Sequence, residues 1–485
     1  MSADTLIHGT ETAIIAYFLA LNAIYLVFTA MAFVDLLAYR RHVWRGALSP
    51  TLSESAYKPI SILVPAFNER LTLVATIRSL LTLRYPEFEI VVVNDGSTDD
   101  SLDLVRSAFN LYPVPTATRV LLETKPVRAT YRSLDHPTLV VIDKENGGKS
   151  DSLNAGINTS SYPLFCSMDA DSVLEPDALL RVARAFKEDD RVVCAGGIIR
   201  VLNGAVIEDG QVTHIRAPSR PLILCQAIEY VRGFLTGRTP LCKLDALLIV
   251  SGAFGLFRKD AVVEAGGYHT GTVCEDMEII VRLHRWSHEH GKAARIIFVP
   301  DPVCWTQVPS DWRSLLRQRD RWQRGLLESL WKHRRMFMNP RYGKVGLIGM
   351  PFYVIFEAFG PIFELLGYVV MLLLWAFGRL NPGIAVLFFV LAVLNGIILS
   401  VAALVLDDLL FKRYERSRDL LKMIGAAFIE YCGFRQLLAL QRTASFLNVV
   451  FRRGHWGKAD RMSMPDSGGG AAALGAAPGA TAVQP

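Results

Sequence analysis

Two stretches of the chain combine residue types and spacing that suit catalysis. Cys274–Glu278 places an acidic pair, Glu275 and Asp276, at a predicted junction between a loop and a helix. Gln318–Trp322 follows on a predicted basic helix and supplies a glutamine, arginines and a tryptophan. A carboxylate can act as a general base, cations can neutralise an anionic leaving group, and an aromatic face can support a sugar ring. Together these residues favour the transfer of a sugar.

The elements that must position these residues come from short apolar runs that alternate with amphipathic stretches. The runs are β-branched and lack polar alternation, which is typical of buried strands; they lie at Ile60–Val64, Glu89–Val93, Leu139–Ile142, Leu164–Met168, Val192–Ile199, Leu247–Val250 and Ile296–Val299. Predicted helices separate most of them, at Leu71–Leu81, Leu102–Asn110, Asp177–Phe186 and Met277–His288. This alternation predicts an α/β domain with a largely parallel sheet covered by helices on both faces.

Polar residues stand where three of the predicted strands end. The first strand ends in Pro65–Glu69, the second in Asn94–Asp99 and the fourth in Asp169–Asp171. Ligands of parallel sheets bind beyond the carboxyl ends of the strands, so we expect a binding crevice there. We also expect a helix to begin near Ser97 or Thr98, so that its free backbone amides face the crevice.

Asp169 and Asp171 are predicted to hold a metal ion. They are two residues apart, and the period of a strand puts both carboxylates on the same side. Two hard carboxylates with few other ligands suit Mg²⁺ or Mn²⁺ that also holds a diphosphate. The spacing of the three histidines between 284 and 290 could suggest a metal site, but a solvated helix face explains it better.

Each motif also has a less specific interpretation. Asn-Asp-Gly is a common turn, and most chance Asp-x-Asp sequences lie in solvated loops. Glu145–Ser150 is similar to a fragment of a phosphate loop but lacks the Walker spacing. Lys149 is therefore expected to make a single contact to a base or phosphate, and not to build an ATP site. Several polar segments follow buried strands in succession along the chain, and this order makes a chance origin of the motifs a poor explanation.

The N-terminal region predicts a membrane anchor. From Thr12 to Val34 there is no charged residue, and this length matches the ~20 apolar residues that span a bilayer. Arg40, Arg41 and Arg45 follow, so the positive-inside rule places the N-terminus outside and the next domain in the cytoplasm. An uncleaved anchor fits better than a signal peptide, because the run is long and lacks a basic start and a clear cleavage site.

The C-terminal region is apolar again, with charges inside it. Val345–Phe377 contains Glu357 and Glu364, which either line a polar path or, for Glu357, lie among the headgroups if the first half is interfacial. Ile384–Leu406 is predicted to span the membrane. Leu420–Val450 contains three charged residues, and three interpretations stay open for it: one membrane helix, a hairpin or an in-plane amphipathic pair.

Composition bounds the remaining possibilities. The chain has 485 residues, of which 51% are hydrophobic, and a net charge of +6. Its seven cysteines are odd in number and show no Cys-x-x-Cys spacing, so a reducing cytoplasm suits them better than a disulfide framework. The basic residues cluster beside apolar runs, which indicates charge at a lipid surface and no nucleic-acid-binding stripe.

We therefore predict five parts, in a multi-pass protein of the cytoplasmic (inner) membrane. They are an N-terminal transmembrane anchor (1–48), a cytoplasmic catalytic domain (58–310), an interfacial amphipathic helix (311–342), C-terminal transmembrane or interfacial helices (343–450), and a tail that is basic and then disordered (451–485).

The order and wording of the motifs resemble the membrane-embedded family 2 glycosyltransferases, the group that contains hyaluronan, cellulose, chitin and poly-N-acetylglucosamine synthases. The resemblance covers Ile60 to Trp331. It implies a GT-A (Rossmann-like) catalytic domain between transmembrane helices, a UDP-sugar donor, Mg²⁺ or Mn²⁺ as cofactor and a growing polysaccharide as acceptor. N-acetylglucosamine or glucose in β-linkage is the sugar that it implies.

The resemblance also implies roles at the donor side. The family's nucleotide-binding motifs match Pro65, Asn68, Glu69 and Asp95, with Asp95 on the uracil or ribose. Asp169-Ala170-Asp171 looks like the family's Asp-x-Asp, which contacts UDP and the metal, with Asp171 as the direct metal ligand.

At the acceptor side the implied roles fall on three motifs. Ser251, Gly252 and Ala253 stand where the family holds its acceptor sugar. Cys274-Glu275-Asp276 is similar to the family's Thr-Glu-Asp or Gly-Asp-Asp, which makes Asp276 the candidate base with Glu275 beside it. Gln318, Arg321 and Trp322 match the Gln-x-x-Arg-Trp motif that is typical of the chain-extending enzymes of the family.

Three departures from the family and two rival functions remain. Cys274 precedes the acidic pair, a single helix precedes the catalytic domain, and Tyr112–Pro137 adds a predicted surface hairpin.

One rival function is a single transfer of sugar to polyprenyl phosphate, and the other is a silent nucleotide-sugar-binding subunit of a synthase complex. An export or regulatory partner would have to come from another chain, since no cyclic-nucleotide-binding module follows the last helices.

Overall fold

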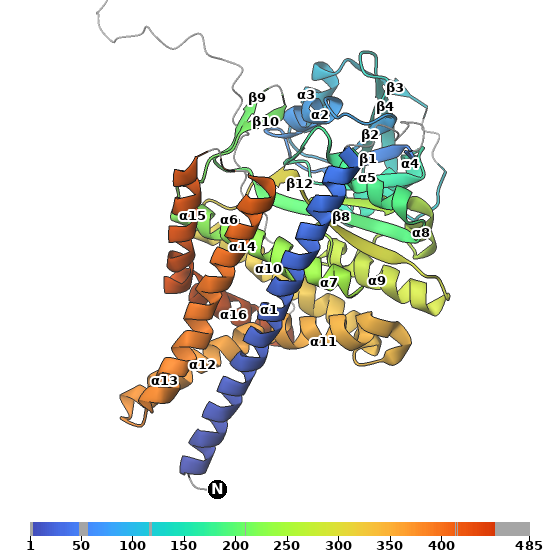
Figure 1. The fold of residues 1–485 in the computed structure, drawn as a ribbon. Coiled ribbons are helices and arrows are strands. Elements are labelled where there is room, and N and C mark those ends of the chain that lie inside the picture. Colours follow the sequence, from blue (N-terminus) through green and yellow to red (C-terminus); the bar gives the residue numbers. More distant parts are fainter. Residues whose placement is uncertain are drawn as a thin grey trace, which may run out of the picture.

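The centre of the molecule is a mixed sheet of ten strands in the order β3-β4-β5-β2-β1-β6-β11-β8-β12-β7 (Figure 1). The computed structural model describes residues 3–47, 57–115, 119–208, 210–412, 414 and 416–451. The strands are β1 (Ile60–Ala66), β2 (Phe88–Asn94), β3 (Leu111–Val114), β4 (Val127–Ser133), β5 (Leu139–Lys144), β6 (Leu164–Met168), β7 (Ser172–Leu174), β8 (Val192–Val201), β11 (Phe254–Arg258) and β12 (Arg295–Thr306). A separate hairpin pairs β9 (Val206–Glu208) with β10 (Gln211–His214).

Strands β5, β2, β1 and β6 run parallel, as predicted. Ile60 at the start of β1 lies between Phe88 of β2 and Leu164 of β6, so the four strands end together at one edge of the sheet. Nearly all of their residues are buried, because helices cover both faces. The predicted strands at these positions, in β8 and in β12 are confirmed.

The predicted strand at Leu247–Val250 is wrong. These residues are buried in irregular backbone that leads into Ser251, and the strand follows later as β11, which runs antiparallel between β6 and β8. A short apolar run indicates burial but does not specify pairing with another strand. The edges of β6 and β8 are already paired with β11. The sheet is consequently mixed, and less parallel than predicted.

One prediction is confirmed and another needs correction in the region from β2 to β4. The hairpin predicted within 112–137 is confirmed, since β3 pairs antiparallel with β4; β4 also pairs with β5, so the hairpin extends the central sheet at its edge. The helix after β2 begins at Ser101 and not near Ser97 or Thr98. Asn68 holds the intervening turn instead, since its amide oxygen accepts a hydrogen bond from the backbone of Thr98 at 2.8 Å.

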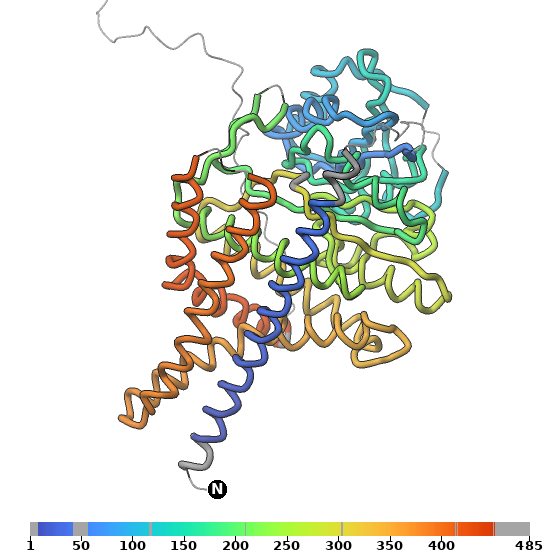
Figure 2. Tube along the Cα trace, in the orientation of Figure 1, coloured from blue at the N-terminus to red at the C-terminus, as the bar shows by residue number. Residues whose placement is uncertain are grey.

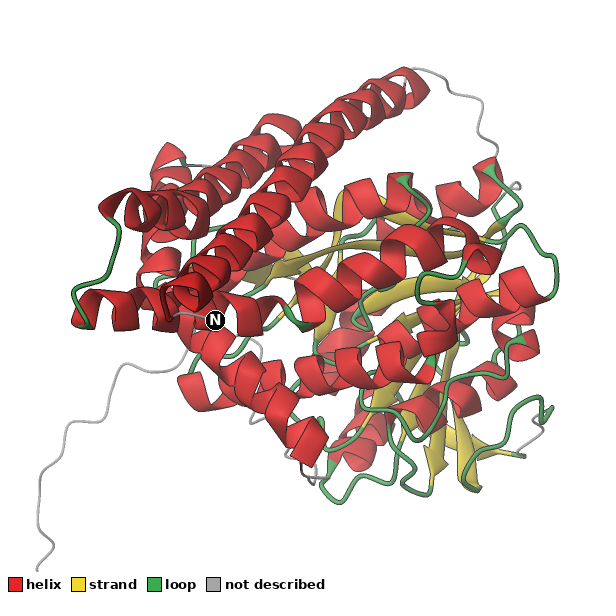
Figure 3. Cartoon of the chain, turned by 90° about the horizontal axis from the view of Figure 1, so that it is seen from below, coloured by secondary structure: helices red, strands yellow, loops and turns green. Residues whose placement is uncertain are grey.

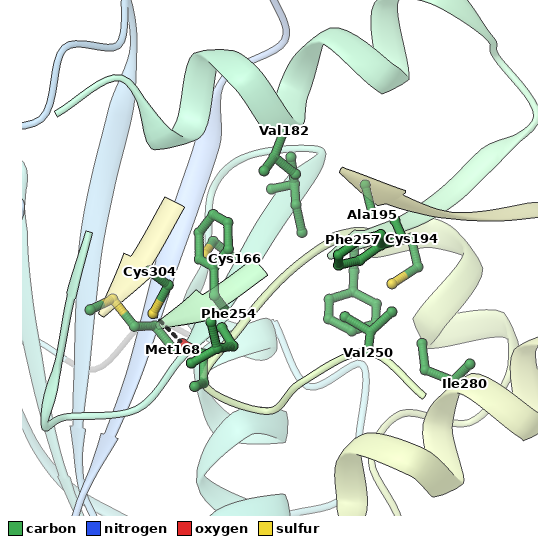
Figure 4. Packing of buried hydrophobic residues seen from close by; sticks show 14 of the residues in the cluster. Cys166, Met168, Val182, Cys194, Ala195, Val250, Phe254, Phe257, Ile280 and Cys304 are labelled. Atoms are coloured by element: carbon green, nitrogen blue, oxygen red, sulfur yellow. Dashed lines mark hydrogen bonds between the residues drawn. The ribbon is translucent and has the colours of Figure 1, made fainter. Parts of the chain in front are cut away.

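Helices pack on both faces of the sheet (Figure 3). In the catalytic region they are α2 (Leu73–Leu81), α3 (Ser101–Ala108), α4 (Lys149–Thr159), α5 (Ala178–Glu188), α6 (Pro221–Arg232), the π-helical turn η2 (Gly233–Arg238), α7 (Thr239–Lys243), α8 (Lys259–Glu264), α9 (Glu275–Glu289) and α10 (Trp312–Lys332). The predicted helices in α2, α3, α5 and α9 are confirmed. Sulfur-containing and aromatic side chains fill the core between β6, β8 and β11, among them Cys166, Cys194 and Phe254 (Figure 4).

Four helical segments are long and apolar enough to cross a membrane: His8–Arg41, Val345–Ala376, Pro382–Phe411 and Ser417–Val449. The first belongs to α1 (Ala3–Ala47), and the others comprise η5 (Val345–Gly349), α11 (Met350–Phe352), η6 (Tyr353–Ala358), α12 (Gly360–Ala376), α13 (Pro382–Phe389), η7 (Val390–Leu394), α14 (Asn395–Phe411), α15 (Ser417–Ile429), η8 (Glu430–Phe434) and α16 (Arg435–Phe451). The blue N-terminal helix and the orange helices α12 and α13 project from the same side of the catalytic domain (Figure 2).

The segment Leu420–Val450 is not one straight helix. Cys432 and Gly433 have non-helical backbone, with Gly433 at φ 126, so the chain turns between α15 and α16. The first helix packs on α6 and α14, whereas the second packs along α10 and α12. Of the three interpretations that stayed open, this break rules out one straight membrane helix and leaves the hairpin and the in-plane amphipathic pair. The predicted tail after Phe451 and the linker at 48–56 lie outside the described residues.

Helices α9 and α10 are joined by a buried carboxylate. The Glu278 side chain is fully buried and lies 2.8 Å from Arg282, 3.0 Å from Lys332 and 3.3 Å from His333. Burial alone would raise the pKa of Glu278, but these donors and cations lower it to about 2. Glu278 therefore fixes the helix that begins with the acidic pair against the helix that carries Trp322.

We predict that acid weakens this contact. The pKa of Glu278 is about 2 in the folded chain against an ordinary value of 4.5, so its stabilisation is present above pH 4.5 and is lost as the pH falls toward 2. Glu278→Gln should remove a contribution on the order of 3 kcal/mol at pH 7. The apparent melting temperature in detergent should therefore fall less between pH 5 and pH 3 for this variant than for the unaltered protein.

The control is Glu289→Gln on the same helix, because the partly exposed Glu289 pairs with Arg285 and the hydroxyl of Tyr342. It should leave the melting temperature nearly unchanged at pH 7. Parallel acid profiles for the unaltered protein and Glu278→Gln would contradict the role of Glu278.

Candidate active site

Lys149 joins two of the predicted motifs. It is the first residue of α4, and its Nζ lies 2.6 Å from Oδ1 of Asp169 and 2.8 Å from Oε1 of Glu275. Asp169 follows β6, whereas Glu275 begins α9. The parallel strands end at this edge, so residues far apart in the sequence meet around one ammonium group.

The charged groups of this cluster shift one another's pKa values. Burial alone would lower the pKa of Lys149, but the carboxylates of Asp169 and Glu275 outweigh it and raise this pKa well above its usual range. Glu275 is the converse case: burial alone would raise its pKa, and the charge of Lys149 lowers it. Both groups are therefore charged at neutral pH and form a fixed ion pair.

Asp276 behaves differently from its neighbour. Its Oδ1 accepts a hydrogen bond from the backbone of Met277 at 2.8 Å, and its Oδ2 accepts one from Gly252 at 3.1 Å. Burial and the adjacent charge of Glu275 raise the pKa of Asp276 above its ordinary value. A carboxylate with a raised pKa holds a proton more readily, which is what a general base requires.

Asp169 and Asp171 lie in the turn between β6 and β7, with Asp171 facing a buried environment. Burial and the charge of Asp169 raise the pKa of Asp171 to about 7. Such mutual repulsion between carboxylates is relieved by a divalent cation. The donors are oxygens only, and in the described parts of the chain no group of three or more His, Cys, Asp or Glu residues could hold a metal ion. These two carboxylates fit Mg²⁺ or Mn²⁺ whose other ligands come from water and a diphosphate.

Asp95 organises the loop on the nucleotide-binding side. Its buried carboxylate accepts hydrogen bonds from Lys144 at 2.7 Å, from the backbone of Gly147 at 2.9 Å and from the backbone of Gly148 at 2.7 Å. Lys144 is fully buried and also lies 2.6 Å from Asp151. Lys144 and Asp151 were not predicted from the sequence, because neither belongs to a motif. The position of a lysine at the end of a buried strand could have indicated Lys144.

The other predicted nucleotide-binding residues lie close to Asp95. Pro65 is in β1, and Asn68 takes a left-handed backbone conformation with φ 56. The Asn68 backbone donates to the Ser97 hydroxyl at 3.0 Å, and the Glu69 backbone donates to the Ser101 hydroxyl at 2.9 Å. These bonds hold the loop after β1 against the loop after β2.

Ser251, Gly252 and Ala253 lie between Lys149 and the acidic pair. Nζ of Lys149 is 3.5 Å from the carbonyl of Gly252, whose amide binds Asp276. An added Cβ on Gly252 would stand 3.0 Å from Lys149 Nζ and 3.3 Å from Asp276 Cβ, so a side chain here would crowd both groups. Of the three predicted acceptor-site residues, Gly252 thus lies directly beside the proposed base.

The predicted Gln-x-x-Arg-Trp residues share α10. Arg321 and Trp322 are exposed, and the exposed fraction of Trp322 is 39%. The Arg319 guanidinium lies 4.2 Å from the centre of the Trp322 ring, which fixes the plane of the indole. The side-chain oxygen of Gln318 is buried and has no hydrogen-bond partner within the described residues.

Cys274 provides the contact between α9 and α10. Its thiol lies 3.8 Å from the carbonyl of Arg321, and a Cβ built on Gly325 would stand 2.1 Å from its sulfur. Gly325 is therefore the position on α10 that admits Cys274. This gives a physical account of the cysteine before the acidic pair: it sets the spacing between that pair and the helix of Trp322.

Comparison with known proteins assigns the family. The model of the glycosyltransferase-like family 2 matches residues 58–325, and the chain belongs to this family. The mixed α/β sheet and the apolar helices at both ends agree with the predicted GT-A domain between membrane helices.

Individual relatives are similar over part of their length. Poly-β-1,6-N-acetyl-D-glucosamine synthase of Staphylococcus aureus (strain COL) is 27% identical over 277 residues, which is 57% of this chain and 56% of that protein. The synthase of Staphylococcus epidermidis is 28% identical over 277 residues, or 56% of each chain. The chain thus spans about half the length of the curated relatives that it matches. A mannosyltransferase of Pyrobaculum calidifontis, solved with GDP-Man and Mn²⁺, is 18% identical with a TM-score of 0.48, over 90% of this chain and 100% of that one.

We predict that Gly325→Ala destabilises the contact between α9 and α10. The new methyl group would overlap the Cys274 side chain, and overpacking of this kind costs about 1–3 kcal/mol. The apparent melting temperature in detergent should fall accordingly. Cys274→Gly in the same chain should restore it in part, since it removes the overlapping atoms; an additive effect of the two substitutions would contradict the contact.

Proposed function

We propose that this protein is a processive inverting glycosyltransferase of the cytoplasmic membrane. It polymerises a sugar from a UDP donor into a β-linked polysaccharide, and N-acetylglucosamine is favoured over glucose because the matched relatives are poly-β-1,6-N-acetyl-D-glucosamine synthases. The observation that carries the proposal is the cluster around Lys149, which gathers Asp169, Glu275 and Asp276 at the edge where a nucleotide sugar binds family 2 domains.

Asp276 is the proposed base. Inversion requires a group that takes the proton from the acceptor hydroxyl as this oxygen attacks the anomeric carbon. Oδ1 and Oδ2 of Asp276 each accept a backbone hydrogen bond, from Met277 and Gly252, which fixes the direction of the carboxylate. Its raised pKa favours uptake of the proton. Glu275 serves this step indirectly, by holding Lys149 in place.

The donor side is assigned to the loops after β1, β2 and β6. Pro65, Asn68, Glu69 and Asp95 shape the proposed nucleotide site, with Asp95 acting through the loop that it holds. A divalent metal held by Asp169 and Asp171 supplies positive charge to the diphosphate and stabilises it as a leaving group. Lys149 adds a second positive charge beside Asp169.

The acceptor side is assigned to α10 and to the turn at Ser251. Trp322 offers an exposed aromatic face on which a sugar ring can lie, and the charge of Arg321 acts on Glu275. Retaining a polymer between transfers needs such a platform, whereas a single transfer to polyprenyl phosphate does not.

The membrane arrangement follows from charge and from the apolar helices. We assign the catalytic domain (58–310) to the cytoplasm, 311–342 to the inner surface and 343–450 to the bilayer or its surface; the arginines after the first apolar helix support this orientation through the positive-inside rule. Glu357 and Glu364 lie near Arg442 (3.6 Å) and Arg435 (2.9 Å), so their charges are paired within the helices. A polar path beside these pairs would carry the product outward.

The test of this function is UDP release by purified protein in lipid vesicles, with a panel of UDP-sugars and Mg²⁺ or Mn²⁺. We expect release with UDP-N-acetylglucosamine, a product of high molecular mass, and no release when EDTA removes the metal. A product of lipid size would replace the proposal with transfer to polyprenyl phosphate. No release with any donor would reject it in favour of a silent subunit.

We predict that Asp276→Asn abolishes polymer formation. An amide cannot take the proton, and loss of a general base lowers rates by about 10²–10⁴-fold. The matched control is Asp260→Asn on α8, because Asp260 pairs with Arg258 at the surface and should leave UDP release unchanged. An Asp276→Asn variant that forms polymer at the normal rate would show that another group is the base.

A further inference from the structure

Arg238 is a cation of the active-site region that no sequence motif includes. It ends η2, the π-helical turn that continues α6. Its guanidinium lies 3.8 Å from the centre of the Phe234 ring, and its side chain is half-buried. Helical turns of the π type are rare and occur frequently at functional sites. The position of Arg238 therefore calls for a physical explanation.

Arg232, just before it on α6, provides an internal comparison. Its guanidinium donates to both carboxylate oxygens of Glu430, at 2.7 and 2.9 Å. Burial acts to lower the pKa of both arginines. At Arg232 the charge of Glu430 outweighs burial and the pKa is raised, whereas at Arg238 burial prevails and the pKa is lowered. Among the described residues no carboxylate pairs with Arg238, and the ring of Phe234 is its recorded contact. A partly desolvated cation with no carboxylate in direct contact is costly unless a ligand compensates it.

A row of aromatic rings connects Arg238 to α10. The ring of Phe234 lies 6.1 Å from that of Tyr230, and the ring of Tyr230 lies 6.4 Å from that of Trp322. Arg319 ends the row, with its guanidinium over Trp322. Residues 230, 234 and 238 are four apart, which keeps their side chains on one side of the helix. The row is thus a continuous wall with a cation at each end.

The surroundings of Arg238 place this wall at the acceptor side of the site. The groups that act electrostatically on Arg238 are Asp276, Tyr230 and Tyr353. Asp276 begins the acidic helix, and Tyr353 lies in η6, within the first apolar segment after the catalytic domain. Arg238 is therefore within the electrostatic influence of both the proposed base and the first apolar segment, and its aromatic row reaches Trp322.

We propose that Arg238 is a substrate-contacting residue, which donates hydrogen bonds to hydroxyl oxygens of the sugar at the growing end of the acceptor. The planar guanidinium presents several N–H donors in a fixed geometry, which suits adjacent hydroxyl groups of a sugar. Tyr230 and Trp322 offer aromatic faces to the acceptor, while Phe234 supports the guanidinium. This assignment rests on the proposed glycosyl transfer and deepens it.

The test separates acceptor binding from donor binding. It compares Arg238→Gln and Arg238→Lys with the unaltered protein, using β-linked oligosaccharides of the donor sugar as acceptors. Arg238→Gln should raise the KM for the acceptor about tenfold or more, the effect of losing one charged hydrogen bond, and should leave the donor KM and acceptor-independent UDP release within about twofold. Arg238→Lys keeps the charge and should show a smaller rise.

The matched control is Arg285→Gln, because Arg285 lies on the surface of α9 and pairs with Glu289 at 2.8 Å. It should leave both KM values unchanged. An unchanged acceptor KM in an active Arg238→Gln protein overturns the inference, and so does an equal rise in the donor KM. If Arg238→Gln lowers the melting temperature, the acceptor KM of Arg238→Lys decides. Absence of UDP release by the unaltered protein would instead reject the proposed function itself.

Discussion

The active site depends on one ammonium group among carboxylates. Lys149 lies between Asp169 and Glu275, and Asp171 and Asp276 stand close to the same pair. Burial, and the charge of carboxylates that one lysine does not neutralise, raise the pKa values of Asp171 and Asp276, the two acids that lack a direct lysine contact. That residual negative charge is what makes the site suited to a divalent cation on one side and to proton uptake on the other.

The second requirement is a fixed distance between the acidic pair and the aromatic platform. Three contacts set it: Glu278 binds Lys332, Cys274 fits against Gly325, and Arg319 lies on the ring of Trp322. The first two join α9 or the residue before it to α10, the third orients the indole within α10, and none needs a ligand. The arrangement is therefore built before substrate binds, which lowers the ordering cost of catalysis.

The catalytic domain and the apolar helices form one packed body. Phe28, Ala32 and Leu36 of α1 are buried in the same core as the central strands. Arg200 at the end of β8 pairs with the buried Asp407 of α14, and Arg232 pairs with Glu430. Buried pairs like these are strongly destabilised when one partner is removed, because the other charge is left uncompensated. A product formed at the sheet edge would thus meet membrane helices whose position is already set.

The sequence by itself determined the buried central strands, the polar strand ends and the motifs, because burial and period are local properties; β1, β2, β5 and β6 lie as predicted, and a helix carries Trp322, from Trp312 to Lys332. The strand predicted at Leu247–Val250 is wrong, since an apolar run does not specify a hydrogen-bonding partner. Only the tertiary structure decided which charges meet. Lys144 beside Asp95, Cys274 against Gly325 and Arg238 without a carboxylate are facts of packing between distant segments, and no spacing within the chain encodes them.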